Sequence, residues 1–343
     1  MVAKLIVHSD TNREDALKKF QNALSQCELR GTTTNLEFCE DISKNLKGFV
    51  EGNYDTGLLE SSPSVFENLK QGIFVEDGGI NTTVQDLGRT PQRMGKTTAW
   101  SIGIPPSGAM DDVSARVANL LVSNDENDAV LEFTSRGPTL RFNQDTKIAV
   151  CGEFTNATLN GKAFDSFFEP VSVNSGDVLK IGTVARTMMR GYLAVEGGGI
   201  DVPKYLNSKS TLTLGNLGGH QGRSLVPGDT LRFVADKVRT TSEPDVSAAK
   251  DLQVTMYNEK NLKRIGVLVG PQDDLFTEQD MQTFFSQEYE VDYNSNRMGI
   301  RLKGPAPTWA RESGGEGGSH PSNVVDNTYA IGMHNFISLT FAF

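Results

Sequence analysis

The stretch that decides the fold of this chain is Gly137–Cys151, which reads GPTLRFNQDTKIAVC. Two short apolar runs, Leu140–Phe142 and Lys147–Cys151, lie on either side of a polar turn, and each is expected to form a strand. The first part returns at Gly228–Phe233 as GDTLRF, which shares five of its six positions with GPTLRF. Each copy is a tight turn followed by a strand. Because the spacing of such copies is irregular, the pattern predicts recurrent hairpins and not a solenoid.

The same texture extends along the chain from about Gly72. Apolar runs alternate with turns rich in Gly, Asn, Asp and Pro, which is typical of an all-β sandwich or barrel. Further strands are expected at Gly72–Val75, Val178–Ile181, Tyr192–Val195, Leu231–Val234 and Arg264–Val269. Two helices are expected to interrupt the strands, one after Thr277 and one from about Ser107 with Met110, Val113, Val117, Leu120 and Leu121 on one face.

The first 62 residues look different, because they carry helical signals. Thr11–Glu14 and Thr34–Glu37 each have the S/T-x-x-E pattern of a capping box, and apolar residues at helical spacing follow both. Ser61–Ser64 reads as a linker. We therefore predict a mainly β chain with an α+β N-terminal part, divided into residues 1–62 and 63–343.

Composition narrows the classes of function. The chain has 343 residues and 33 Lys and Arg against 43 Asp and Glu, a net charge of -10, which argues against a nucleic-acid or anionic-membrane partner. No run approaches the roughly 18 apolar residues of a membrane span. Three Cys and four His have no paired spacing, so no metal site is expected. The opening MVAKLIVHSD has no signal-peptide pattern, and we expect a cytoplasmic protein.

The first candidate site is the loop GNLGGHQG at Gly215–Gly222. Gly218 and Gly219 would let backbone N–H groups approach a planar or anionic ligand closely. His220 and Gln221 would add side-chain donors. A purely structural turn fits the same spacing equally well.

The densest glycine cluster is GGEGGSHPS at Gly314–Ser322. Within it, Glu316 and His320 could orient or deprotonate an amide or urea nitrogen. Ser319 and His320 are sequence neighbours, and adjacent residues rarely form a nucleophile–base pair, so we discount a serine hydrolase. The alternative is a flexible surface loop.

Three further motifs carry polar side chains. In DYNSNRMGIRL, Asn296 and Arg297 precede a strand and suit a carboxylate or carbonyl, although a polar hairpin would look the same. GKTT at Gly95–Thr98 lacks the first glycine of a P-loop, which favours a basic surface loop containing Arg89, Arg93 and Lys96. In GIPPSGAMD, Ser107 is expected to cap the helix that follows.

Six motifs in fixed order give the chain a family resemblance. TTVQDLGR, PPSGAMD, GPTLRF, LGGHQGR, NSNRMGIRL and GGEGGSHPSN occur over about Gly72–Asn335. This series resembles the carboxyltransferase domain of the urea carboxylase family, in the subdomain shared with one subunit of bacterial 5-oxoprolinase. The first 60 residues resemble the C-terminal end of a biotin carboxylase domain. Guanidine carboxylases share this layout, so the resemblance leaves urea and guanidine both open as substrates.

The resemblance implies a cyclophilin-like β-barrel and a defined chemistry. Biotin, carried on a domain outside this chain, would bring a carboxyl group to urea and give allophanate. ATP and Mg would act at the biotin carboxylase site, also outside this chain, and a partner carboxyltransferase subdomain would complete the active site. In this half-site we expect Glu316, His320 and Arg297 to be catalytic. Substrate binding is expected from Gly218, Gly219, His220, Gln221, Asn296 and Ser319, and which group is the base stays open.

Two segments depart from the family pattern. PQRMGKTTA at residues 91–99 looks inserted, and MHNFISLTFAF leaves the pattern after Asn335. We therefore expect a fragment of a larger enzyme that is inactive alone, with under-buried helices in residues 1–60. One alternative is a binding module similar to 5-oxoprolinase subunits or their kinase-inhibitor-associated relatives, and another is a non-functional gene product.

Overall fold

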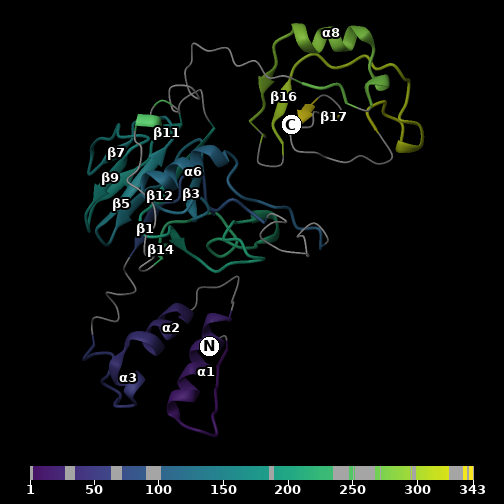
Figure 1. Cartoon of the computed structure of the whole chain (residues 1–343). Coiled ribbons are helices and arrows are strands. Elements are labelled where there is room, and N and C mark those ends of the chain that lie inside the picture. Colours follow the sequence, from purple (N-terminus) through teal and green to yellow (C-terminus); the bar gives the residue numbers. More distant parts are fainter. Residues whose placement is uncertain are drawn as a thin grey trace. The chain divides into compact units, whose positions relative to one another are not determined.

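A computed structural model describes residues 3–27, 35–62, 72–89, 102–184, 189–234, 247–249, 251, 267–270, 272–293, 295, 299–323, 335–337 and 340–342. The chain divides into two compact units, Met1–Asn261 and Leu262–Phe343 (Figure 1). The fold is mainly β with few helices, as predicted. In the part that the structure describes, no helix combines the length and apolar character needed to cross a membrane. The predicted boundary after residue 62 stays a prediction.

The N-terminal segment is helical, with α1 at Arg13–Ser25, α2 at Leu36–Asn45 and α3 at Lys47–Glu51. Its described residues form no strand, so the α+β character predicted for this part is wrong. The cap of α1 is Asn12, whose side-chain oxygen accepts the Asp15 N–H at 2.9 Å, so the predicted Thr11 cap is wrong by one residue. Thr34 of the second predicted box lies outside the described residues. A hydrogen bond from the Gln21 side chain to the Ser43 carbonyl, 2.6 Å long, ties α1 to α2.

The larger sheet of the first unit has seven strands. Their order is β13 (Ile200–Asp201), β14 (Thr230–Phe233), β1 (Ile73–Asp77), β4 (Thr139–Phe142), β10 (Val178–Lys180), β7 (Thr158–Leu159) and β8 (Lys162–Ala163). The two TLRF copies are β4 and β14, and both pair antiparallel with β1, where Ile73 lies opposite Phe142 on one side and Leu231 on the other. The repeated motif therefore supplies the two strands that flank one central strand.

The second sheet has five strands, again antiparallel. Their order is β2 (Asn81–Gln85), β3 (Val130–Thr134), β12 (Arg190–Val195), β5 (Thr146–Cys151) and β9 (Pro170–Val173). The stretch 137–151 thus joins β4 of one sheet to β5 of the other. Both strands were predicted, and the turn between them carries the chain from one sheet to the other.

The main core lies between the two sheets. Alternate residues of β5 and β12 divide between this core and the outer face: Ile148 and Leu193 point inward, whereas Ala149 and Tyr192 point outward. From the seven-stranded sheet, the buried residues facing this core include Ile73, Val75, Leu140, Phe142, Leu179 and Leu231. Two sheets that share one core form a β-sandwich.

Helix α6 (Asp112–Leu121) covers the outer face of the five-stranded sheet, lying over β12, β5 and β3 (Figure 1). It was expected to start at about Ser107, but its cap is Asp111, whose carboxylate accepts the Ser114 N–H at 3.0 Å. The predicted apolar face is also wrong in part, because Val113 and Leu120 are each 42% exposed. Small residues, among them Ala115 and Ala118, face the sheet and let the helix lie close to it.

The remaining strands form smaller sheets. In the first unit β6 (Phe154–Thr155) pairs with β11 (Thr183–Val184). In the second unit the order is β15 (Glu290–Val291), β16 (Arg301–Lys303), β18 (Thr340–Ala342) and β17 (Asn335–Ile337). The strand pairings of the described residues give open sheets and no closed barrel, so the cyclophilin-like barrel stays a prediction.

The second unit also holds α8 (Glu278–Ser286), which begins after Thr277 as predicted. Short 3-10 turns lie at Thr213–Gly215, Asp273–Leu275 and Gly315–Gly317. The predicted strand Arg264–Val269 is wrong where it is described: residues 267–269 join no sheet, and Leu268 is 96% exposed.

Candidate functional site

The glycines of the first candidate loop pack tightly against residues 209–211. Gly218 and Gly219 have φ of +64° and +56°, and a Cβ on them would lie 2.2 Å from the Ser210 carbonyl oxygen and 1.9 Å from the Thr211 hydroxyl. The Gly219 N–H already donates to the Lys209 carbonyl at 3.1 Å. At Gly219 the contacts therefore favour the structural turn, because its N–H is used within the protein.

His220 and Gln221 both lie near Arg223. His220 is 8% exposed, with its Nε2 3.3 Å from Asp229 Oδ1 but without hydrogen-bond alignment. Arg223 binds both oxygens of Asp229 at 2.7 Å, and the exposed Gln221 accepts an Arg223 N–H at 2.9 Å. Burial raises the pKa of Asp229, but hydrogen bonds from Arg223 and the Val226 N–H, together with the nearby His220 ring, bring it well below its ordinary value. His220 is therefore a buried imidazole beside the ionised carboxylate of Asp229.

Asp86 holds the segment 208–210, against which these glycines pack. Its Oδ1 accepts hydrogen bonds from Ser208 Oγ at 2.7 Å, Ser210 Oγ at 2.5 Å and the Gly88 N–H at 2.7 Å. Its Oδ2 accepts the Lys209 N–H at 2.7 Å. One buried carboxylate thus orders residues 208–210. This role of Asp86 was not predicted from the sequence, in which DLGR was recognised only as part of the series of six motifs.

Arg89 corrects another prediction, because it is 1% exposed and does not lie in a surface loop. Its Nε donates to the Tyr205 carbonyl at 3.2 Å, its Nη2 donates to the Ser210 carbonyl at 2.6 Å, and its guanidinium lies 5.4 Å from the Tyr205 ring centroid. Burial lowers the pKa of Arg89. Arg93 and Lys96, predicted in the same loop, lie outside the described residues.

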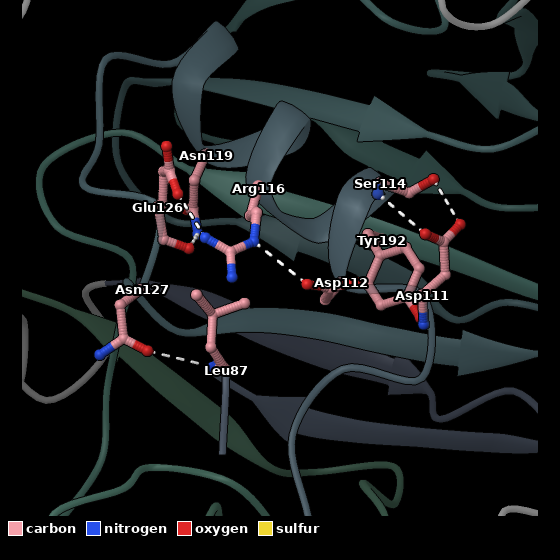
Figure 2. A network of polar contacts seen from close by, with 9 residues as sticks. All are labelled: Leu87, Asp111, Asp112, Ser114, Arg116, Asn119, Glu126, Asn127 and Tyr192. Atoms are coloured by element: carbon pink, nitrogen blue, oxygen red, sulfur yellow. Dashed lines mark hydrogen bonds and ion pairs between the residues drawn. The ribbon is translucent and has the colours of Figure 1, made fainter. Parts of the chain in front are cut away.

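The PPSG turn is tied to the same place. The Arg89 N–H donates to the Pro106 carbonyl at 2.6 Å, and the Ala109 N–H donates to the Asp86 carbonyl at 2.8 Å. Below the turn, the Tyr192 hydroxyl accepts the Asp111 N–H at 2.7 Å and donates to buried Glu132 at 2.9 Å. Figure 2 shows Tyr192 and Asp111 together at the start of α6. These contacts give the 86–89 and 106–111 loops one fixed arrangement.

The second candidate loop, Gly314–Ser322, lies in the second unit. Arg311 spans it, donating from Nε to the Pro321 carbonyl at 2.7 Å and from Nη2 to the Asn323 carbonyl at 2.6 Å. Glu316, Ser319 and His320 are all exposed on this loop, and their roles in a site stay predictions. The loop is shaped by specific contacts and is not a bare linker.

His320 has a defined hydrogen-bonding state in this loop. Its Nδ1 accepts the Ser322 N–H at 3.2 Å and lies 2.7 Å from the Ser322 hydroxyl. A backbone N–H can only donate, so Nδ1 carries the lone pair and the neutral ring carries its proton on Nε2. The ring can therefore donate a hydrogen bond through Nε2.

Most of the predicted site residues fall on two loops, one in each unit. Gly218, Gly219, His220 and Gln221 belong to one loop of the first unit, and Glu316, Ser319 and His320 belong to one loop of the second. Asn296 and Arg297 lie outside the described residues. Among the residues that the structure places, no group of three or more His, Cys, Asp or Glu could hold a metal ion.

Comparison with protein families identifies the family of this chain. Residues 102–338 match the family described as carboxyltransferase domain, subdomain A and B. The chain belongs to this carboxyltransferase family. Residues 1–61 match the biotin carboxylase C-terminal domain, so parts of two domain types follow one another in this carboxyltransferase chain.

Known relatives agree with both matches. Urea amidolyase of Saccharomyces cerevisiae is 39% identical over 98% of this chain and 18% of its own length. A putative urea carboxylase of Emericella nidulans is 35% identical over 98% of this chain and 26% of its own length. The chain thus spans about a fifth to a quarter of the length of these relatives. A 5-oxoprolinase subunit of Haemophilus influenzae is 32% identical over 68% of each chain.

Solved structures give the same picture. The urea carboxylase of Kluyveromyces lactis superposes with a TM-score of 0.75 at 40% identity, over 96% of this chain and 28% of that one. The K. lactis urea amidolyase gives 0.73 at 38% identity, over 96% of this chain and 19% of that one. The chain therefore corresponds to the carboxyltransferase region of urea carboxylases, together with the end of their biotin carboxylase domain.

Proposed function

We propose that this chain is the carboxyltransferase part of a biotin-dependent urea carboxylase, which transfers a carboxyl group to a urea nitrogen and gives allophanate. The observation that carries the proposal is its 39% identity to a urea amidolyase across 98% of the chain, through both domain types. The 5-oxoprolinase relative explains less, because it matches 68% of the chain. A cytoplasmic location and a cyclophilin-like barrel belong to the same proposal.

The exposed loop in the second unit fits a planar, polar substrate. His320 presents an Nε2–H donor and Glu316 an exposed carboxylate acceptor, and urea and the ureido ring of biotin both carry the matching carbonyl and N–H groups. Carboxybiotin, when bound, supplies the carboxyl group. ATP and Mg would be used at a biotin carboxylase site outside this chain, and a carrier domain and a partner subdomain would be required.

Within this proposal each residue of the loop has one task. His320 donates through Nε2 to the carbonyl oxygen of urea, which stabilises the charge that develops there. Glu316 accepts the proton that leaves the attacking urea nitrogen, and this proton would pass to the biotin nitrogen that is released when its bond to the carboxyl group breaks. Ser319 contacts the substrate, Asn296 and the Gly218–Gln221 loop keep their predicted roles in binding, and Arg297 keeps its predicted catalytic role. The chain alone is proposed to be inactive.

The test replaces the corresponding region of the S. cerevisiae urea amidolyase with this chain. We expect the chimera to release phosphate from ATP in a urea-dependent reaction, and to lose that dependence with His320→Ala or Glu316→Gln. Biotin-dependent ATP cleavage without urea is the control for folding of the rest of the enzyme. A chimera that passes this control but never responds to urea contradicts the proposal. A response to guanidine in place of urea would correct its substrate.

A further inference from the structure

Trp309 adopts a backbone conformation that a bulky side chain rarely takes. Its φ is +65°, in the left-handed region, where strain must be offset by surrounding contacts. Its N–H donates to Asp280 Oδ2 at 3.2 Å, and the next N–H, from Ala310, donates to the Leu275 carbonyl at 3.0 Å. Non-glycine residues held in this way concentrate at functional sites.

Asp280 does more than cap its own helix. Its Oδ2 accepts the Thr277 N–H at 2.9 Å, which completes the capping box of α8. The same carboxylate accepts the Thr308 N–H at 2.7 Å and the Thr308 hydroxyl at 2.8 Å, besides the Trp309 N–H. Most of its hydrogen bonds therefore hold the Thr308–Trp309 turn, and a helix cap needs none of these.

The ring of Trp309 connects this turn to the candidate loop. It packs on Phe276 with ring centroids 5.1 Å apart, and it meets the His320 ring edge-on at 6.2 Å with an interplanar angle of 82°. Edge-to-face contacts of this kind fix the relative orientation of two rings. Ser322 fixes the same imidazole at Nδ1. His320 is thus oriented from two sides, and its Nε2 is not used by either contact.

We propose that Asp280 and Trp309 are positioning residues that hold the His320 imidazole in its donor orientation. This inference rests on the proposed function for the catalytic task of His320. Neither residue is required to touch the substrate. Asp280 fixes the backbone of Trp309, and the indole ring fixes the imidazole.

The first test measures the geometry without any activity. In the full chain, the ring-proton resonances of His320, assigned with His320→Gln, are recorded at a pH where the imidazole is neutral. Trp309→Leu and Asp280→Asn should both move these resonances, because the ring current of the indole is lost or displaced. Asp292→Asn is the matched control: Asp292 is another buried carboxylate of this unit, bound to Lys303 at 2.6 Å, and its loss should leave them in place.

The second test uses the chimeric urea amidolyase. Trp309→Leu and Asp280→Asn should lower kcat by about 10- to 100-fold with little change in the KM for urea, because a misplaced donor mainly weakens the transition state. Trp309→Phe keeps an aromatic edge and should restore most of kcat. Trp309→Leu leaves the Thr277–Asp280 cap intact, so it remains informative if Asp280→Asn fails to fold.

The two tests fail independently. His320 resonances that ignore both substitutions overturn the positioning role, whatever the activity. Equal losses of kcat in Asp280→Asn and Asp292→Asn also overturn it, because they would show a general structural effect. An unsubstituted chimera without urea-dependent turnover contradicts the proposed function, and the resonances then still decide the positioning role.

Discussion

At the scale of single residues, Asp86 is the group on which the first candidate loop depends. It accepts four hydrogen bonds, from Ser208, Ser210, Lys209 and Gly88, in a place closed to water. Removing a buried acceptor leaves its donors unsatisfied, which costs more than the net value of each bond. A carboxylate on the surface does not satisfy several buried donors in this way.

We expect Asp86→Ala to lower the free energy of unfolding by about 3 kcal/mol or more, because several buried donors lose their partner. Denaturant unfolding measures the change. Asp77→Ala is the control, since Asp77 pairs with Arg136 while 43% of its side chain is exposed, and it should cost about 1 kcal/mol or less. Equal effects would show that the Asp86 network is not special.

Gly219 gives a sharper test of the same loop. Gly219→Ala should cost about 2 kcal/mol or more, because its Cβ would lie 1.9 Å from the Thr211 hydroxyl and its φ is positive. Gly228→Ala carries only the second penalty, since φ is +97° but nothing lies within 4 Å of a Cβ. Melting temperatures of the two variants separate the steric part from the backbone part. A Gly219→Ala protein as stable as Gly228→Ala would contradict the packing described here.

At the scale of elements, the start of α8 should respond to pH. Burial raises the pKa of Asp280, but hydrogen bonds from Thr308 and Thr277 bring it down to about 2 from an ordinary 3.8. A carboxyl group whose pKa is lower in the folded than in the unfolded protein stabilises the fold at pH values above its unfolded pKa. This stabilisation is lost as the pH falls through the folded pKa. We expect this contribution, about 1–2 kcal/mol, to be full above pH ~4 and to disappear towards pH ~2.

Denaturant unfolding of the native chain and of Asp280→Asn at about pH 6 and about pH 3 checks this window. The difference in unfolding free energy between the two proteins should shrink at the lower pH. A difference that stays constant would show that Asp280 is not held as a carboxylate by these bonds.

Helix α6 shows which face of an element the tertiary structure buries. Ala118 faces the five-stranded sheet and is fully buried, whereas Leu120 is largely exposed. Ala118→Leu should therefore destabilise the protein by about 1–3 kcal/mol through overpacking. Leu120→Ala, which changes the larger side chain, should cost well under that. Thermal unfolding compares the two, and the reverse order would mean that the helix buries the face predicted from its leucines and valines.

At the scale of the whole molecule, the two TLRF copies show that the fold buries the same local sequence to different extents. Both copies flank β1, but Phe142 is fully buried between the sheets and Phe233 only partly so. Phe142→Ala should cost about 3–5 kcal/mol, and Phe233→Ala clearly less, because less packing is lost. Denaturant midpoints of the two variants provide the measurement. Equal losses would contradict the placement of the core.

Local sequence determined much of this protein. The alternation of apolar runs and turns predicted the positions of β1, β4, β5, β10, β12 and β14. Thr277 predicted the start of α8, and six motifs in order predicted the family. These features depend on neighbours along the chain, where spacing and turn chemistry act directly. The GGEGGSHPS loop was also singled out in this way, and the site roles of Glu316, Ser319 and His320 stay predictions.

Only the tertiary structure decided how distant segments meet. It placed β4 and β5 in different sheets, buried Arg89, and turned the small residues of α6 towards the outer face of the five-stranded sheet. It also brought hydrogen-bond donors to two carboxylates: to Asp86 from up to 124 residues away, and to Asp280 from up to 29 residues away. The physical reason is that a buried polar group takes whichever partner the fold brings near, and side-chain burial depends on the facing element. Neither can be read from local spacing.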